Sequence, residues 1–290
     1  MKKIVVTGSK GKLGSELVKH KNCFAVKSDI LNSNKLESEI LKIDPDVVIN
    51  CAAITDVDYC ETTVGYDKAI DVNYKGVIVL LDTCRKLGCK LLHISTDYVF
   101  DGVNGAYKEN NETLSAKTGT PVNNYGWSKL GGESLLFNDG GDTSLVIRTT
   151  GLYGITKGHN FFLLVKNKVG IGRELFVTEE LFGNQTYIPH LVKALLYIAN
   201  YPELFQEHRV LHVASKEVIS RYDFALRIAD EFGYDKSLIM PVQNHDISSW
   251  VAKRPTHGGL IITRAQKLGI PIYTIDEGIN DVHKYYNSLL

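Results

Sequence analysis

A glycine-rich turn directly after the first apolar run constrains the fold of this chain most. The β-branched run Ile4–Thr7 leads into Gly8, Gly11 and Gly14, and an apolar helical pattern starts at Leu13. In a strand, turn and helix of this kind, the first glycine makes the tight turn and the second lets backbone N–H groups approach a pyrophosphate. The third lets the helix pack closely on the sheet. Three glycines are costly in a helix start that binds nothing, so we predict a dinucleotide-binding turn.

Short β-branched runs alternate with helical patterns through the first half of the chain. This alternation predicts βαβ units and a parallel sheet of the doubly wound Rossmann type, an α/β fold. Pro45 ends one helix before a strand, and Gly88 and Gly233 follow helices as C-terminal caps. The expected strands are Ile4–Thr7, Phe24–Lys27, Asp46–Asn50, Leu91–Ser95 and Ser144–Thr149, and the expected helices between them are Leu13–His20, Lys35–Leu41 and Tyr66–Leu87.

Beyond Thr150 the order of elements is less regular. We expect residues 1–150 and roughly 187–215 to form an NAD(P)-binding Rossmann domain, and roughly 151–186 and 216–290 a smaller, partly interleaved substrate-binding region. No flexible linker separates them, so the cleft between them is the expected active site. Ser220 and Asp223 are placed to cap a helix start. The helices expected here are Phe161–Val169, Pro189–Asn200, Tyr222–Phe232 and Ile275–Ser288.

Composition excludes several classes of function. The 33 Lys and Arg residues balance the 33 Asp and Glu residues without a like-charge block, which argues against nucleic acid as a partner. The first apolar run is too short for a signal peptide or a membrane span, so a soluble cytoplasmic protein is expected. The five cysteines show no CxxC spacing and the nine histidines no clustering, so neither a redox centre nor a metal is predicted.

The residue that closes the second strand decides between NAD and NADP, because a carboxylate there accepts the ribose hydroxyls and a cation meets a 2′-phosphate. The chain offers both, in Lys27 and Asp29. Lys27 aligns better with the strand end, and Lys10 and Lys12 add positive charge. NADP(H) is therefore favoured and NAD(H) stays open. Asp29 would then face the adenine or be an ordinary turn acid.

A tyrosine and a lysine at YxxxK spacing are the candidate proton-transfer pair. On a helix this spacing places Tyr125 and Lys129 on one face, where an ammonium can lower the pKa of the phenol. Tyr153 and Lys157 share the spacing, but three nearby glycines disfavour a helix there. Tyr125 instead begins a helical pattern, so we choose the first pair.

Hydroxyl side chains follow the fourth expected strand, at the sheet edge where ligands of open α/β folds bind. Ser95 and Thr96 stand at this strand end, and the alternative to a binding role is ordinary strand-end capping. The expected mechanism is hydride transfer from nicotinamide to a ketone. Tyr125 donates a proton to the developing alkoxide and Thr96 orients its oxygen, while Lys129 tunes Tyr125 and holds the nicotinamide ribose.

These residues resemble the extended short-chain dehydrogenases, and within them the dTDP-4-dehydrorhamnose reductase family. The resemblance runs in order along nearly the whole chain. It rests on the strings TGSKGKLG at Thr7–Gly14, PDVVINCAAITDVDYCE at Pro45–Glu61, DVNYKG at Asp71–Gly76, STDYVFDG at Ser95–Gly102, PVNNYGWSKLGGE at Pro121–Glu133, RTTGLYG at Arg148–Gly154, HNF at His159–Phe161 and KRP at Lys253–Pro255.

The resemblance implies NAD(P)H-dependent reduction of the 4-keto group of a nucleotide-activated 6-deoxyhexose, as in dTDP-4-dehydrorhamnose to dTDP-rhamnose. It implies catalytic roles for Thr96, Tyr125 and Lys129. The guanidinium of Arg254 would suit the substrate's diphosphate or be a surface arginine. The implied cofactor contacts are Gly8, Lys10, Gly11, Lys12, Leu13, Gly14, Lys27, Asp29, Ala52, Ala53, Asn73, Ser95, Tyr125 and Lys129, and the implied substrate contacts are Thr96, Asp97, Tyr98, Val99, Asn160 and Arg254.

The chain departs from the family pattern on the sugar side, at Ile54, Asp56, Gly151 and Phe182–Thr186. Another nucleotide-linked 4-ketohexose therefore stays open as the substrate. The superfamily also implies a homodimer that pairs through the helices containing residues 66–87 and 125–137.

Three rival functions share parts of this pattern. Sugar-nucleotide dehydratases carry an Asp-Glu pair after the threonine, whereas here Asp97 is followed by Tyr98, which disfavours elimination. An epimerising reductase needs further Cys or His groups near the sugar, and His159 is the one nearby candidate. The regulatory β subunit of methionine adenosyltransferase has similar strings and acts chiefly by binding a partner, so a binding role stays open.

Overall fold

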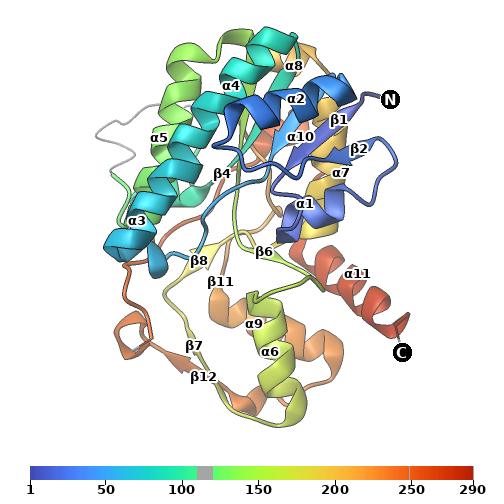
Figure 1. Cartoon of the computed structure of the whole chain (residues 1–290). Helices are drawn as coiled ribbons and strands as arrows, with labels where there is room; N and C mark the ends of the chain where they lie inside the picture. Colours follow the sequence, from blue (N-terminus) through green and yellow to red (C-terminus); the bar gives the residue numbers. More distant parts are fainter. Residues whose placement is uncertain (110–119, 248, 290) are drawn as a thin grey trace.

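A parallel sheet forms the centre of the computed structural model, which describes residues 1–109, 120–247 and 249–289. Within these residues the sheet has six strands in the order β10-β5-β4-β3-β1-β2, and every neighbouring pair is parallel. The predicted doubly wound α/β fold is thus confirmed (Figure 1). The strands are β1 Ile4–Thr7, β2 Cys23–Ala25, β3 Val47–Asn50, β4 Lys90–Thr96, β5 Ser144–Thr149 and β10 Val210–His212.

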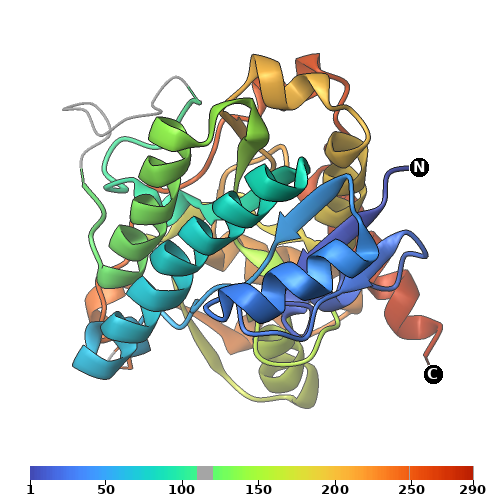
Figure 2. The same ribbon diagram turned by 45° about the horizontal axis from the view of Figure 1, so that its top comes forward.

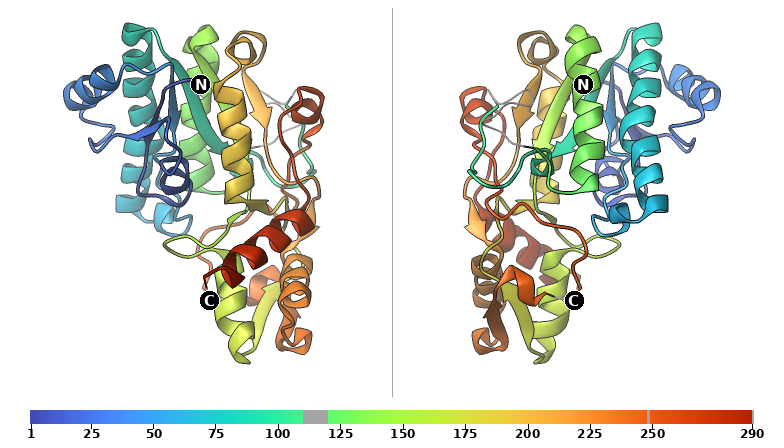
Figure 3. Two further views of the ribbon diagram at one scale, coloured as in Figure 1. Left: turned by 90° about the vertical axis from the view of Figure 1, so that its right-hand side faces the viewer. Right: turned by 90° about the vertical axis from the view of Figure 1, so that its left-hand side faces the viewer.

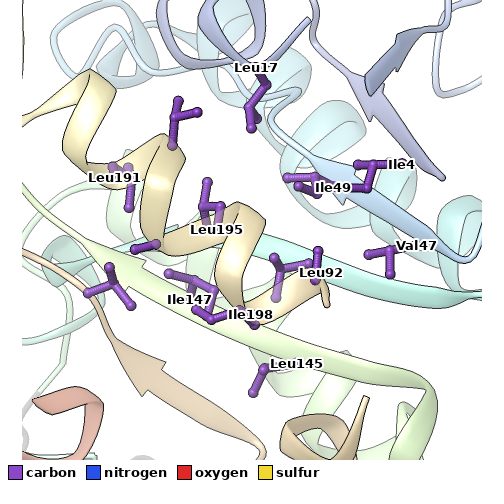
Figure 4. Close-up of a cluster of buried hydrophobic side chains, with 14 of the residues drawn as sticks. Ile4, Leu17, Val47, Ile49, Leu92, Leu145, Ile147, Leu191, Leu195 and Ile198 are labelled. Atoms are coloured by element: carbon purple, nitrogen blue, oxygen red, sulfur yellow. The ribbon is translucent and has the colours of Figure 1, made fainter. Parts of the chain in front are cut away.

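Helices cover both faces of this sheet, which explains why its strands are apolar without interruption. On one face, Leu191, Leu195 and Ile198 of α7 point toward Ile49 and Leu92 of the strands (Figure 4). On the other face α2, α4 and α5 lie side by side (Figure 2). The first layer contains α1 Lys12–Leu17, α7 Ile188–Ala199 and α8 Glu203–Glu207, and the second contains α2 Ser33–Ile43, α4 Gly76–Leu87 and α5 Asn124–Asp139.

A second apolar cluster lies beyond the carboxyl edge of the sheet (Figures 1 and 3). Its buried side chains include Tyr153, Phe162, Phe224 and Ile279. None of the described helices is both long and apolar enough to cross a membrane. The elements of this part are β6 Leu152–Tyr153, α6 Phe161–Lys168, β7 Leu175–Thr178, β8 Phe182–Gly183, β9 Thr186–Tyr187, β11 Ile219–Ser220, α9 Arg221–Phe232, β12 Ile239–Val242 and α11 Ile275–Asn287. Helix α10 (Thr263–Lys267) instead contacts β10 and buries Ala265 in the cluster on the first face of the sheet.

The predicted helix over residues 66–87 is wrong in its start and in its continuity. Helix α3 (Thr63–Ile70) begins earlier, because the Thr62 hydroxyl accepts a hydrogen bond from the backbone N–H of Gly65. A π turn at Asp71–Lys75 then separates α3 from α4. This turn contains Asn73, whose amide contacts two other segments of the chain, as described below.

Two further boundaries differ from the sequence prediction. Strand β2 ends at Ala25, because the backbone N–H groups of Lys27 and Ser28 donate to the Glu39 carboxylate instead of to a neighbouring strand. Helix α1 ends at Leu17. The predicted caps are confirmed, since Gly88 and Gly233 have φ of 70° and 68° after their helices. The Ser220 hydroxyl likewise accepts from the N–H of Asp223.

A buried ion pair attaches α5 to the sheet. Nη2 of Arg148 on β5 lies 2.5 Å from Oε2 of Glu133 on α5, and Nε of Arg148 lies 2.9 Å from Oε1. The two side chains are 1% and 0% exposed. Arg148 also stacks on Phe100, 4.8 Å from the ring centroid.

Replacing Glu133 by alanine is expected to lower the free energy of unfolding by about 3–5 kcal/mol, because it leaves the Arg148 guanidinium buried without its counter-charge. Urea denaturation measures this. The double variant Glu133→Leu, Arg148→Met is the control, since it removes both charges and should regain most of the loss. A single variant that loses less than about 1 kcal/mol would contradict a buried pair of this kind.

Candidate active site

The crevice at the carboxyl edge of the sheet opens where the strand order reverses. From β1 the chain passes to β2 on one side, and then crosses to β3 on the other side of β1. Ligands of doubly wound folds bind at such a point. A cavity of ≈ 590 Å³ lies there, and the predicted site residues that line it are Lys10, Gly11, Lys12, Leu13, Ala53, Ser95, Thr96, Asp97, Tyr98, Tyr125, Lys129 and Asn160.

The glycine turn has the geometry that its sequence predicts. Gly8 has φ of +62°, and a Cβ there would lie 2.6 Å from the backbone N of Ala52. A Cβ on Gly14 would collide with the backbone of Gly8. The turn closes with a 2.9 Å hydrogen bond from the N–H of Gly11 to the carbonyl of Gly8. Gly8 and Gly14 therefore shape the turn, while Gly11 borders the cavity.

Thr96, Tyr125 and Lys129 meet on one wall of this cavity. Thr96 ends β4, and Tyr125 and Lys129 stand one turn apart on α5. Burial raises the pKa of Tyr125, and the neighbouring Thr96 hydroxyl only partly offsets this. The sequence predicts that Lys129 lowers the pKa of the phenol; in the structure its ammonium donates to the carbonyl of Ile94, 2.8 Å away, and the net shift of the Tyr125 pKa is upward.

A chain of hydrogen bonds runs from β1 through the sheet to Lys129. The Thr7 hydroxyl donates to Oδ1 of Asn50 at 2.6 Å, and the N–H of Ala52 donates to the same oxygen at 3.1 Å. Nδ2 of Asn50 lies 3.0 Å from Nδ1 of His93. Nε2 of His93 lies 3.2 Å from Nζ of Lys129. Local sequence gave no signal for this series of hydrogen bonds, because the residues that form it come from three strands and a helix.

These hydrogen bonds determine which ring nitrogen of His93 carries the proton. Because Oδ1 of Asn50 accepts two hydrogen bonds, its amide NH₂ must face Nδ1 of His93, which accepts. Burial, followed by the charge of Lys129, holds the pKa of His93 well below its usual range, so the ring is neutral and protonated on Nε2. An ammonium cannot accept a hydrogen bond from Nε2–H. The histidine therefore disfavours the charged form of Lys129, whose pKa burial already lowers to about 8.

Residues after β4 hold the end of the strand in place. The Asp97 carboxylate is hydrogen-bonded to the side chains of Thr96 and Thr150, and burial raises its pKa. The Tyr98 ring lies edge-on to Tyr125, with centroids 5.6 Å apart. Val99, a predicted substrate contact, is packed in an apolar cluster away from the cavity.

Six predicted cofactor contacts lie outside the cavity lining, and two of them, Gly8 and Gly14, shape the turn described above. Lys27 and Asp29 are exposed, and Asp29 accepts from the N–H of Leu31 within a turn. Ala52 packs against the glycine turn. The Asn73 amide bonds to the backbone of Ile54 and to the Ser128 hydroxyl, so it joins the loop after β3 to α5. Within the described residues no group of three His, Cys, Asp or Glu side chains is placed to hold a metal ion.

Two arginines lie beside Trp250, and the sequence predicts a site role only for Arg254. Arg254, the predicted diphosphate contact, is paired with Asp58 at 2.6 Å and is absent from the cavity lining. Arg221, the first residue of α9, lines the cavity, and its buried Nε has no hydrogen-bond partner. The sequence gave no signal for Arg221 because no motif contains it. Asn160 borders the cavity and caps α6 by accepting from the N–H of Leu163.

Comparison with known proteins places these features in one family. The family model described as RmlD substrate binding domain matches residues 1–288. A dTDP-4-dehydrorhamnose reductase of Aggregatibacter actinomycetemcomitans is 32% identical over 288 residues, 92% of this chain and 93% of that protein. A dTDP-4-keto-6-deoxy-D-glucose reductase of Streptomyces niveus is 28% identical, over 84% of this chain and 83% of that protein. The crystal structure of dTDP-4-dehydrorhamnose reductase from Bacillus anthracis in complex with NADP superimposes with a TM-score of 0.87 at 26% identity, covering 98% of this chain and 100% of that one.

We expect ¹⁵N NMR of the histidine side chains to show His93 neutral and protonated on Nε2 at pH 7, for the reason given above. The variant Asn50→Leu identifies the cause, since without the amide donor His93 is free to take its proton on Nδ1. A His93 ring that carries its proton on Nδ1 in the unaltered protein would rule out this arrangement.

Proposed function

We propose that this chain, which belongs to the family of the RmlD substrate binding domain, is an NAD(P)H-dependent oxidoreductase that reduces the 4-keto group of a nucleotide-activated 6-deoxyhexose. The type reaction is dTDP-4-dehydrorhamnose to dTDP-rhamnose. One observation carries the proposal, namely that Thr96, Tyr125 and Lys129 line the same cavity as the glycine turn. A ketone whose oxygen is within reach of the Thr96 and Tyr125 hydroxyls would therefore lie near a dinucleotide bound at that turn.

The residues at this edge of the sheet fit a nicotinamide dinucleotide. Gly11 and the cations Lys10 and Lys12 border the cavity, and burial lowers the pKa of Lys12. The hydroxyl of Ser95 is buried, lines the same cavity and has no hydrogen-bond partner among the described residues. When bound, the cofactor supplies the hydride. NADP is favoured because Lys27 and Lys10 are exposed near the end of β2, whereas the Asp29 carboxylate is used in a turn.

Tyr125 acts as the proton donor in this proposal. Its raised pKa keeps the phenol protonated, and a phenol gives up its proton most readily to a strongly basic alkoxide. Thr96 orients both oxygens from its position beside Tyr125 on the same cavity. Lys129, one turn along α5, stabilises the phenolate that remains and is placed to return a proton to it.

Two further points are part of the proposal. Residues of roughly 151–186 and 216–290 form the region that binds the sugar, and the protein works in the cytoplasm.

A purely regulatory role is the alternative function. Oxidation of the cofactor that depends on a ketosugar separates the two, because a binding subunit does not consume the reduced cofactor.

Tyr125→Phe is expected to lower kcat by about 10²–10⁴-fold, which is the usual contribution of a positioned proton donor. The assay follows oxidation of NADPH with dTDP-4-dehydrorhamnose generated in situ. Tyr153→Phe is the matched control, because Tyr153 has the same YxxxK spacing but is buried in the second apolar cluster. Equal loss in both variants would count against Tyr125 as the donor.

Activity is expected to fall as the pH rises through about 8, because burial lowers the pKa of Lys129 to about 8 and its ammonium is present only below that pH. The pH profile of kcat/KM with NADPH measures this. In Lys129→Arg the guanidinium stays charged, so residual activity should lose this alkaline limb. A limb that persists unchanged in Lys129→Arg would assign it to another group.

We also propose a homodimer that pairs through α3 and α5. Both helices expose apolar side chains, namely Val64 and Tyr66 on α3 and Trp127 on α5. The two helices contact each other and so form one surface. Light scattering after size exclusion should return a dimer, and Trp127→Glu should shift it toward monomer, whereas a monomeric native protein would reject this surface.

A further inference from the structure

Arg221 is a cation without a counter-charge. Within the part of the chain that the structure describes, no carboxylate lies in ion-pair distance of its guanidinium, and its buried Nε makes no hydrogen bond. Burial lowers the pKa of Arg221, and the neighbouring Arg254 adds repulsion. Arg221 is partly buried, and because a charge withdrawn from water is normally paired, its unpaired guanidinium indicates a site for an anion.

Aromatic rings hold Arg221 in a fixed orientation. Its guanidinium carbon lies 4.9 Å from the Phe161 ring centroid and 5.9 Å from that of Trp250. Stacking uses the flat face of a guanidinium and leaves the in-plane N–H groups free, and two of these can bind phosphate oxygens together.

Arg254 provides the contrast. It stacks on the same Trp250 ring at 5.0 Å, but Nη2 donates to Asp58 and Nη1 to the carbonyl of Ala252 at 2.8 Å. Its charge is neutralised by the Asp58 carboxylate, and each of its two Nη atoms already donates one hydrogen bond. Of the two arginines beside Trp250, Arg221 is the one whose charge is not already paired within the described residues.

Arg221 also stands where two hollows meet. The first is the cavity that contains Thr96 and Tyr125. The second, of ≈ 780 Å³, lies over α6 and shares Asn160, Phe161 and Arg221 with the first. Its lining includes the half-exposed Leu164 beside Phe161, together with the polar His159, Asn167 and Lys168. An aromatic and an aliphatic side chain with polar groups around them suit a planar base.

We propose that Arg221 binds the diphosphate of the nucleotide-sugar, and that the hollow beyond it, over Phe161 and Leu164, receives the nucleoside. This rests on the proposed function, since it assumes a sugar at Thr96 and Tyr125. The three parts of the ligand then bind in sequence along the site. The ketosugar lies in the first hollow, the diphosphate at the junction of the two hollows, and the base in the second hollow. Arg254 holds the loop at Asp58 and supports Trp250.

Fluorescence of Trp250 tests the proposal without turnover. The chain has two tryptophans, so Trp127→Phe leaves Trp250 as the reporter beside Arg221. In that background dTDP and thymidine are titrated with NADP⁺ present, which occupies the glycine turn. Arg221→Gln should weaken dTDP binding about 10–100-fold, the range for lost charge-assisted hydrogen bonds, and leave thymidine binding within about twofold.

Two further variants complete the design. Arg227→Gln is the matched control, because Arg227 lies on the same helix but is paired with Asp276 at the surface. It should leave both affinities unchanged. Leu164→Asp should weaken thymidine, and dTDP at least as much, since a carboxylate replaces the apolar contact of the base and also stands in the hollow that Arg221 lines. Urea denaturation confirms that each variant is folded.

The outcomes separate this proposal from the proposed function. Unchanged dTDP affinity in Arg221→Gln, or equal loss of dTDP and thymidine, overturns the role of Arg221. Unchanged affinities in Leu164→Asp overturn the base site. A native protein that binds dTDP through Arg221 but reduces no ketosugar supports the binding site and refutes the reductase. Reduction of a ketosugar that is unchanged in Arg221→Gln supports the reductase and refutes the binding site.

Discussion

The buried ion pair between Glu133 and Arg148 fixes the helix on which the proposed chemistry depends. Helix α5 carries Tyr125, Lys129 and Glu133 at intervals of four residues, so the three side chains share one face. Because Glu133 accepts three hydrogen bonds from Arg148 of strand β5, the other two side chains are held near the ends of the neighbouring strands. A helix held only by apolar packing could rotate slightly, and small displacements of a proton donor are costly in rate.

The second constraint is the burial of the proton-transfer pair. Burial raises the pKa of Tyr125 and lowers that of Lys129, so both shifts favour the uncharged form of each group. The hydrogen bonds through Asn50 and His93 act in the same direction on Lys129. A site that has not yet bound its cofactor and substrate therefore keeps its charge low, and the two groups become charged when chemistry requires it.

The two sides of the crevice obtain their residues differently. The proposed cofactor side takes the glycine turn from the end of β1, Ser95 from β4, and Tyr125 and Lys129 from one face of α5, so its chemistry lies in short, contiguous motifs. The proposed substrate side takes Asn160 and Phe161 from the start of α6, Gln185 from between β8 and β9, and Arg221 from α9. The departures of this chain from the family pattern fall on that side, which is where a change of substrate would be encoded.

The sequence by itself determined the features that depend on local geometry. Alternating strands and helices, the glycine turn and the YxxxK spacing are set by the periods of helix and strand, and the structure places them as predicted. Only the tertiary structure decided which polar groups meet. Asp58 neutralises Arg254 across 196 residues, and His93 reaches Lys129 from another element. A charge is available to a ligand only if no distant residue has already paired with it, and that pairing is a property of the packed chain.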